Sequence, residues 1–234
     1  RKCTKRMLKA KHESRRILIC AGTRPEAITM VPVLRALRAR PEHFEVLLCS
    51  TGQHREMLRQ AFADFGVAPD IELDVLVPNQ SLAGLSARLF DVIDGLLARE
   101  CPHVLLVQGD TTTVQIAALC AFYRGVLVGH VEAGLRSHNL RSPFPEELNR
   151  RIAGMVSDFH FAPTDAAKRN LLAEGMQVDR VFITGNTVID ALLWMAEAVR
   201  CQPPPLPVEV ESLVTGGDQF VLITGHRRES FGSG

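Results

Sequence analysis

HVLLVQGDTTTVQIAALCAFYRGVLVGHVEAGLR, residues 103–136, is the stretch of sequence that decides the fold. It begins with a short apolar run at 103–108, continues with a helical pattern at 112–123 and ends with a second apolar run at 126–131. Apolar runs of this length, without polar alternation, are typical of strands that are buried on both faces of a sheet. Two such strands with a helix between them predict a parallel pair joined by a helical crossover.

The same alternation continues in both directions from this unit. ILICA at 17–21 and FEVLLCS at 44–50 are apolar runs that each precede a helical pattern. At 82–99 the apolar side chains recur at steps of three and four, which indicates an amphipathic helix. The expected strands are 17–21, 44–50, 103–108, 126–131, 159–163, 181–185 and 220–224, and the expected helices are 25–40, 54–65, 82–99, 112–123, 145–157, 165–174 and 187–200. We therefore expect an α/β fold, a Rossmann-like parallel sheet with helices on both faces.

Composition divides the chain into four segments. Residues 1–15 form a basic leader, for which a disordered extension is the favoured interpretation; a misread start of the sequence and a nucleic-acid or membrane tether are the alternatives. Residues 16–200 form the Rossmann-like domain. The segment 201–218 is rich in proline and is interpreted as a linker. Residues 219–234 are then the first strand and loop of a truncated second domain.

Charge, hydropathy and cysteine usage exclude several classes of protein. Residues 1–16 hold eight of the 27 basic residues and one of the 26 acidic residues, so the rest of the chain is acidic. An acidic body disfavours nucleic acid as the main partner. No run of about 18 apolar residues occurs, so we expect no membrane span. Cys20, Cys49 and Cys120 lie in apolar segments without CxxC spacing, which suits core thiols in a reducing cytoplasm.

The first loop after a strand, AGTRPEA at 21–27, suits an anion. It lacks the G-x-G-x-x-G fingerprint of dinucleotide binding, and the chain has no Walker A sequence, no HExxH and no zinc spacing, so we expect neither cofactor nor metal. Arg24 stands at a helix entrance, followed by Pro25 in the first helical turn. Helix N-termini and arginine side chains both bind phosphate, which favours a sugar nucleotide or another phosphate ester. A surface ion pair of Arg24 is the alternative.

Ligands of open parallel sheets bind at the carboxyl ends of the strands, where the chain enters the next helix. The loops that follow the expected strands should therefore gather along one rim of the sheet. These loops are Gly22–Glu26, Thr51–His54, Gly109–Thr113, Glu132–Arg136 and Gly185–Asn186.

Carboxylates in or near these loops are candidates for acid–base chemistry. Asp110 directly follows a strand, and either it or a neighbouring threonine caps the next helix, or it acts as a base or a ligand to a sugar hydroxyl. Glu132 lies just beyond a buried strand. Glu146 and Glu147 stand in the first turn of a helix, where the helix dipole alone would explain both. Together with Arg24, these residues suggest acid–base work on a phosphorylated polar substrate.

Seven motifs occur in family-like order and spacing. They are GTRPEAI (22–28), TGQHREML (51–58), GDTTT (109–113), GHVEAGLRS (129–137), PEELNR (145–150), ITGNTVIDALLW (183–194) and TGHRRESFG (224–232). Through them the chain resembles the bacterial non-hydrolysing UDP-N-acetylglucosamine 2-epimerases. The resemblance implies the N-terminal half of a GT-B-like two-domain enzyme. Such an enzyme interconverts UDP-GlcNAc and UDP-ManNAc without a redox cofactor, by eliminating and re-adding UDP, and is usually a homodimer.

The resemblance also assigns roles to particular residues. Four residues are assigned to catalysis, namely Asp110, Glu132, Glu146 and His226. Three arginines are assigned to substrate binding, namely Arg24, Arg136 and Arg227. Two residues match a possible allosteric site, namely Gln53 and His54. Many relatives carry lysine at the position of Thr29, so this chain lacks a cation there.

Two other functions remain open at this point. The chain could belong to a related GT-B-type sugar-nucleotide enzyme, such as a glycosyltransferase, a hydrolysing epimerase or an epimerase of uronic-acid nucleotides. It could also be a truncated remnant that binds a nucleotide sugar without turning it over. GTRPE and GHRRESFG favour the UDP-GlcNAc enzyme over the uronic-acid branch. Because the family continues beyond GHRRESFG into most of a second domain, we expect this chain to be inactive alone.

Overall fold

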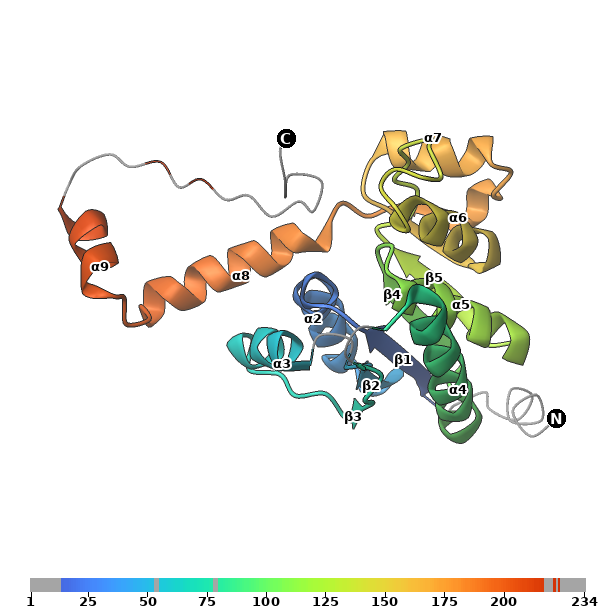
Figure 1. Ribbon diagram of the computed structural model, residues 1–234, viewed down its shortest axis with the longest axis horizontal. Coiled ribbons are helices and arrows are strands. Elements are labelled where there is room, and N and C mark those ends of the chain that lie inside the picture. Colours follow the sequence, from blue (N-terminus) through green and yellow to red (C-terminus); the bar gives the residue numbers. More distant parts are fainter. Residues whose placement is uncertain (1–13, 53–54, 78–79, 217–220, 222, 224–234) are drawn as a thin grey trace. The chain divides into compact units, whose positions relative to one another are not determined.

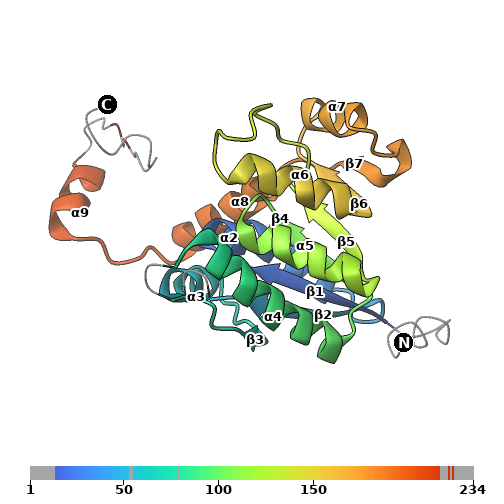
Figure 2. The same cartoon turned by 45° about the vertical axis from the view of Figure 1, so that its right-hand side comes forward.

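The computed structural model describes residues 14–52, 55–77, 80–216, 221 and 223. Within these residues, seven parallel strands form one sheet in the order β3-β2-β1-β4-β5-β6-β7 (Figure 1 and Figure 2). The strands are β1 (Arg15–Ala21), β2 (Phe44–Ser50), β3 (Ile71–Glu72), β4 (Val104–Gln108), β5 (Leu127–Val131), β6 (Phe159–Ala162) and β7 (Val181–Ile183). The strand order reverses between β1 and β4, which makes the carboxyl ends of these two strands the topological switch point of the sheet.

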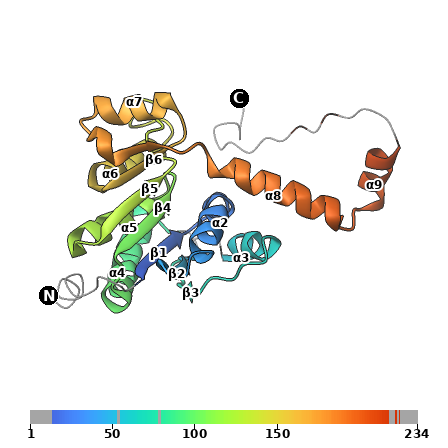
Figure 3. The ribbon, with the colours of Figure 1, turned by 180° about the vertical axis from the view of Figure 1, so that it is seen from behind.

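Helices cover both faces of the sheet. The helices that the structure describes are α2 (Arg24–Arg38), α3 (Arg55–Asp64), α4 (Leu82–Glu100), α5 (Thr112–Arg124), α6 (Glu146–Val156), α7 (Asp165–Ala173), α8 (Thr187–Cys201) and α9 (Val208–Thr215), with a 3-10 turn η1 (Val178–Arg180). Helices α4 and α5 lie on one face (Figure 2) and α2 on the other, with α3 beside it (Figure 3). The chain separates into two compact units, one ending at Met195 and one beginning at Ala196.

A separate apolar core lies on each face. Leu89 and Ile93 of α4 are fully buried on the first face, and Met30 of α2 and Phe62 of α3 are buried on the second. Burying side chains of this size stabilises the fold by about 1.5–3 kcal/mol each. The single tryptophan, Trp194 of α8, stacks on a phenylalanine of this second core region at a ring distance of 5.1 Å.

Local chemistry fixes where the helices begin and end. The hydroxyl of Ser81 accepts a hydrogen bond from the amide of Gly84 at 3.1 Å, which caps α4. Thr164 caps α7 in the same way, with its hydroxyl 3.1 Å from the amide of Ala167. Gly125 ends α5 with a φ of 68°, in the left-handed region that favours glycine. Each such cap is worth about 1 kcal/mol.

The fold class predicted from the sequence is confirmed. The strand and helix positions agree to within two residues, but the two-residue strand β3, the turn η1 and helix α9 were not predicted. Helix α9 lies inside the proline-rich segment 201–218 that we interpret as a linker. The basic leader, except for its last two residues, and most of the strand expected at 220–224 lie outside the described residues. None of the described helices combines the length and apolarity that a membrane crossing needs.

Candidate active site

The carboxylate of Glu132 joins three strand ends at the carboxyl edge of the sheet. Glu132 follows β5 with a φ of 63°, a left-handed conformation that a side chain disfavours unless its surroundings hold it. Its carboxylate accepts hydrogen bonds from two side-chain amides: Nε2 of Gln108, at the end of β4, and Nδ2 of Asn186, after β7, the latter at 3.0 Å. Part of the predicted rim is therefore present in the structure.

The environment of Glu132 favours its protonated form. Burial is the main cause that raises the pKa of Glu132, and the charge of Asp110 adds to the rise, while the amide of Asn186 opposes it. A raised pKa is the direction expected of a carboxyl that takes part in acid–base chemistry. The charge of Asp110 therefore acts on Glu132, and the two residues follow paired strands, β4 and β5.

Asp110 is positioned by α5 and α6. The helix cap of α5 is Thr111, whose hydroxyl lies 3.3 Å from the amide of Val114, so the capping alternative applies to the threonine and leaves the Asp110 carboxylate for other contacts. That carboxylate pairs with Arg150 of α6, and the Asp110 carbonyl accepts a hydrogen bond from Asn149 Nδ2 at 2.8 Å. About a quarter of the Asp110 side chain stays exposed, at 26%.

Glu26 is a buried carboxylate that the sequence analysis did not single out. It is 1% exposed, and its oxygens accept hydrogen bonds from the amide of Gly22 at 2.6 Å and from the hydroxyl of Thr23 at 2.9 Å. Burial raises the pKa of Glu26 to about 7, against the three hydrogen bonds that lower it, and the charge of Asp110 adds to the rise. The T-x-x-E spacing of a capping box was the sequence signal that could have pointed to it.

Arg24 is exposed at the first position of α2, as its place beside Pro25 predicts. No hydrogen bond or ion pair joins it to any part of the chain that the structure describes. Thr29, one turn further, turns its hydroxyl to its own helix and bonds the carbonyl of Pro25 at 2.9 Å. The exposed guanidinium at this helix N-terminus is therefore Arg24.

The two glutamates that open α6 differ in their surroundings. Glu146 is partly buried, and its Oε2 is buried without a hydrogen-bond donor among the described residues. Glu147 is fully buried and accepts hydrogen bonds from the amides of Ser137 at 3.0 Å and His138 at 3.3 Å. Burial alone would raise the pKa of Glu147, but the Ser137 amide and neighbouring arginines outweigh it and hold that pKa below its ordinary value. The helix dipole alone therefore does not explain Glu147, because its carboxylate also anchors the loop at Ser137 and His138.

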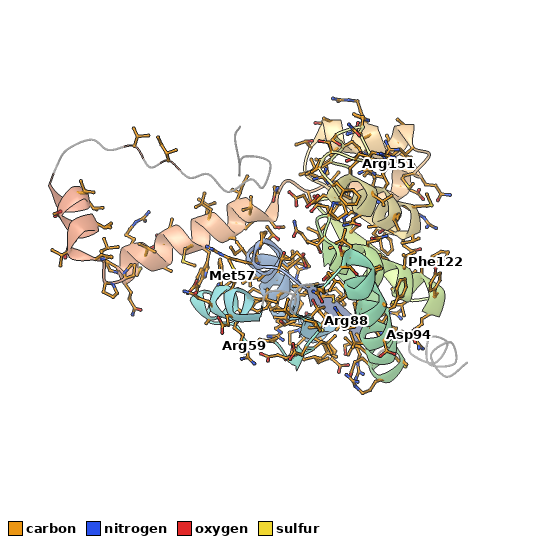
Figure 4. The ribbon with its side chains drawn as sticks, viewed as in Figure 1. Met57, Arg59, Arg88, Asp94, Phe122 and Arg151 are labelled. Atoms are coloured by element: carbon orange, nitrogen blue, oxygen red, sulfur yellow. The ribbon has the colours of Figure 1, made fainter. Side chains whose placement is uncertain are left out.

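Two arginines of α6 pair with Glu147. Arg150 bridges it to Asp110, with Nη1 3.3 Å from Glu147 Oε2. Arg151, labelled in Figure 4, has its Nε 3.5 Å from Glu147 Oε1. The first turns of α6 thus bring positive charge to the carboxylate cluster, which suits an anionic substrate.

Arg136 is held within the protein. Its side chain is 1% exposed, and its Nε and Nη2 both donate to the carboxylate of Glu174 at 2.8 Å, a bidentate pair between the loop after β5 and the residue that ends α7. Its Nη1 bonds the carbonyl of Leu135 at 2.8 Å. This geometry gives the substrate-binding role of Arg136 no support, so that role stays a prediction.

His130 is a second buried group that the sequence analysis missed. Its Nε2 lies 2.7 Å from the carbonyl of Gly109, and the amide of Gly109 bonds the carbonyl of Val131 at 3.1 Å, so β5 holds the turn before Asp110 from both sides. Burial lowers the pKa of His130 to about 4, which keeps the ring neutral. Because Nε2 must then donate, Nδ1 is the bare nitrogen, and it is buried without a partner in the described part of the chain.

The remaining predicted site residues lie outside the described residues. These are Gln53, His54, His226 and Arg227. In the part of the chain that the structure describes, no group of three or more His, Cys, Asp or Glu side chains is arranged to hold a metal ion.

The sheet order defines a Rossmann-like α/β domain, and carboxylate and arginine side chains gather at the carboxyl edge of its sheet. A family model described as UDP-N-acetylglucosamine 2-epimerase matches residues 35–234. The chain therefore belongs to the UDP-N-acetylglucosamine 2-epimerase family.

Individual relatives agree with this assignment. The UDP-N-acetylglucosamine 2-epimerase of Salmonella typhimurium is 46% identical over 222 residues, which are 94% of this chain and 58% of the relative. The enzyme of the same name from Campylobacter jejuni is 42% identical over 227 residues, again 94% of this chain and 58% of the relative. The chain thus spans about three fifths of the length of the curated relatives it matches.

Solved structures give the same result. The UDP-GlcNAc 2-epimerase of Neisseria meningitidis bound to UDP-GlcNAc superposes with a TM-score of 0.78 at 41% identity, over 87% of this chain and 55% of that chain. The Methanocaldococcus jannaschii enzyme in complex with UDP-GlcNAc and UDP has a TM-score of 0.74 at 32% identity, over 86% and 53%. A lipopolysaccharide outer core galactosyltransferase has a TM-score of 0.51 at 10% identity, over 74% and 45%, and shares the fold alone.

Proposed function

We propose that this chain supplies one side of the active site of an enzyme that interconverts UDP-GlcNAc and UDP-ManNAc. The observation that carries the proposal is the placement of Asp110 and Glu132 just after β4 and β5, two paired strands, at the carboxyl edge of the sheet. Family membership and the nucleotide-sugar complexes of two relatives support the same substrate class. The identity of 10% to the galactosyltransferase gives no support to glycosyl transfer to an acceptor.

The chemistry explains why two carboxyls are needed. The C2 carbon of the sugar has no adjacent carbonyl, so its proton is not acidic. A base therefore cannot remove this proton directly to give a stabilised carbanion. Elimination solves this problem: a base takes the C2 proton while the C1–O bond breaks and UDP leaves with the electron pair, giving a glycal. Re-addition of UDP at C1 returns a proton to C2 from the other face. Asp110 and Glu132 are the proposed acid and base.

The other groups bind the substrate in this proposal. Arg24 and the N-terminus of α2 hold the diphosphate. Glu146 lines the sugar site, where its buried oxygen without a donor suits a sugar hydroxyl. His226 and Arg227 contact the diphosphate from the second domain.

Two further parts of the proposal concern assembly and location. Phe122 and Tyr123, at the end of α5, are 57% and 70% exposed, and such large apolar side chains support a homodimer, as is usual in the family. The buried free thiols of Cys20, Cys49 and Cys120 support a reducing compartment, the cytoplasm.

The test uses this chain joined at its C-terminal end to the part of the Salmonella typhimurium relative beyond the matched region. In D₂O the chimera should convert UDP-GlcNAc to UDP-ManNAc with deuterium at C2, because the removed proton exchanges with solvent. D110N should abolish conversion, and D179N, on the exposed turn η1, should not. Conversion with full retention of the C2 proton would contradict the elimination route, and an active D110N would contradict the role of Asp110.

The 234-residue chain alone should not convert UDP-GlcNAc. It spans 58% of the relatives' length, so the groups that would orient the nucleotide from the other side are missing. Positioning of this kind accounts for roughly 7–11 kcal/mol of a barrier. A coupled assay for UDP-ManNAc at high protein concentration checks this, and turnover comparable to that of the chimera would show that one domain builds a whole site.

A further inference from the structure

Glu26 sits where two loops with proposed functions meet. It is in the first turn of α2, and its carboxylate accepts the amide of Gly22 at 2.6 Å and the hydroxyl of Thr23 at 2.9 Å. Those two residues directly precede Arg24, the proposed diphosphate ligand. The Glu26 carboxylate thus fixes the shape of the β1–α2 loop from below the exposed arginine.

The same carboxylate also reaches the neighbouring loop. The hydroxyl of Thr111 donates to it and stabilises its charged form. Thr111 directly follows Asp110 and caps α5. β1 and β4 are the neighbouring strands between which the strand order reverses. Glu26 therefore links the two loops on either side of the switch point.

The loops are packed too closely at this point for the link to be loose. A Cβ atom added at Gly22 would lie 2.4 Å from Thr113 Oγ1, in the first turn of α5, and 2.9 Å from Thr51 Oγ1, after β2. Contacts this short leave no room for a side chain at position 22. The β1–α2 loop is therefore seated directly against α5.

A plain helix cap does not explain a carboxylate at this position. Caps lie at the helix surface and need one acceptor, whereas Glu26 is 1% exposed and has no basic partner among the described residues. Burying a carboxylate that has no basic partner costs free energy, and here the hydrogen bonds from both loops offset that cost. The number and direction of these donors fit a link between loops.

We propose that Glu26 is a positioning residue that holds the loop carrying Arg24 at a fixed separation from the loop carrying Asp110. The inference rests on the proposed function for what the loops do, but the link itself is a property of the fold. The distance between the leaving diphosphate and the acid–base group at C2 would then depend on Glu26. With 1% of Glu26 exposed, its side chain is not open to direct contact with a substrate.

Three substitutions separate this role from general stability. Gln at position 26 keeps the reach of the side chain: its carbonyl can accept the Gly22 amide and its NH₂ can donate to a threonine hydroxyl. Asp is one methylene shorter, so it can serve the α2 turn but cannot also reach Thr111. T111V removes the partner on the other loop, and T164V is its matched control, because Thr164 caps α7 in the same way away from these loops.

The kinetic experiment measures kcat, KM and UDP affinity of the chimera. We expect E26D to lower kcat about 10- to 100-fold, the effect of a small misplacement of catalytic groups, with UDP affinity retained and E26Q close to the unsubstituted enzyme. An unimpaired E26D would overturn the positioning role, as would a fall in UDP affinity as large as the fall in kcat.

A second measurement tests the link without any activity. Urea unfolding of E26D, T111V and the double variant should show non-additive losses, since either change breaks the same link, whereas E26D and T164V should add. Additive losses for E26D and T111V would overturn the proposal even in an active enzyme. If the unsubstituted chimera fails to epimerise while the losses are non-additive, the proposed function fails and the link stands.

Discussion

The buried ring of His130 predicts a specific loss of stability in acid. Its pKa falls from the ordinary 6.5 to about 4, chiefly because burial disfavours the imidazolium, with smaller effects from His160 and nearby arginines. Well above pH 6.5 the ring is neutral in both the folded and the unfolded chain. As the pH falls toward 4, the unfolded chain binds a proton on His130 while the folded chain does not. The free energy of unfolding therefore decreases. Substitution by glutamine keeps a donor for Gly109 and removes the titration.

The size of the effect follows from the two pKa values. Each unit of difference between the unfolded and folded chain is worth about 1.4 kcal/mol, so the total loss is about 3 kcal/mol. About 2 kcal/mol of it falls between pH 7 and pH 4.5. H130Q loses a fixed amount of packing at every pH but none of this proton-linked part. Relative to the unsubstituted chain, H130Q should therefore gain about 2 kcal/mol between pH 7 and pH 4.5.

Urea unfolding at the two pH values, followed by fluorescence of Trp194, measures the difference. Trp194 is the only tryptophan and is packed against Phe65, so its emission reports on the loss of that packing. Other groups that titrate in acid are common to both chains and cancel. H43Q is the matched control, because the side chain of His43 is exposed. A stability difference between H130Q and the unsubstituted chain that is the same at pH 7 and pH 4.5 would refute a neutral, buried His130.

Three further predictions concern packing and charge. G134A should destabilise the fold by at least about 2 kcal/mol. Position 134 has a φ of 90°, and a Cβ there would lie 2.3 Å from the carbonyl oxygen of Ala167. An unchanged melting temperature of G134A would contradict this prediction. Burial raises the pKa of Glu26 from 4.5 to about 7, so the unsubstituted chain loses stability as the pH rises through that range. Relative to the unsubstituted chain, the free energy of unfolding of E26Q should therefore be about 2 kcal/mol more favourable at pH 8 than at pH 5, as measured by urea unfolding. Equal differences at both pH values would count against a buried acid. E174A should cost about 3 kcal/mol by leaving the buried Arg136 unpaired, and E174Q, which keeps one acceptor, should lose less in the same assay.

The order of strands and helices could be predicted because hydrophobic period and length carry that information locally. FEVLLCS coincides with β2, and the run after His103 coincides with β4. Strand β3 could not be predicted, since its two residues are defined by pairing with β2, Ile71 beside Cys49, and not by a pattern of their own. Helix α9 was missed because four prolines in the segment 201–218 outweighed its short apolar pattern.

The site divides in the same way. Asp110 and Glu132 could be placed at one edge of the sheet because topology alone puts the carboxyl ends of parallel strands together. The link from Glu26 to Thr111 was not predictable, since the two are far apart in sequence and their contact depends on how two loops pack. The pair of Arg136 with Glu174 was missed for the same reason: nothing beside Arg136 in the sequence indicates a partner on α7.

The strand order also governs how this domain can assemble. β1 pairs with β2 early, but its other neighbour is β4, and the hydrogen bond that opens this pairing, from the amide of Arg16 to His103 Nδ1, spans 87 residues. Contacts between residues this far apart in sequence form slowly, because closing the long loop between them costs conformational entropy before the contacts can stabilise the fold. During synthesis, one side of β1 therefore stays open as an apolar edge until β4 has left the ribosome. Up to that point the growing chain is vulnerable to strand pairing with other chains, and a chaperone that shields this edge would raise the yield of folded protein.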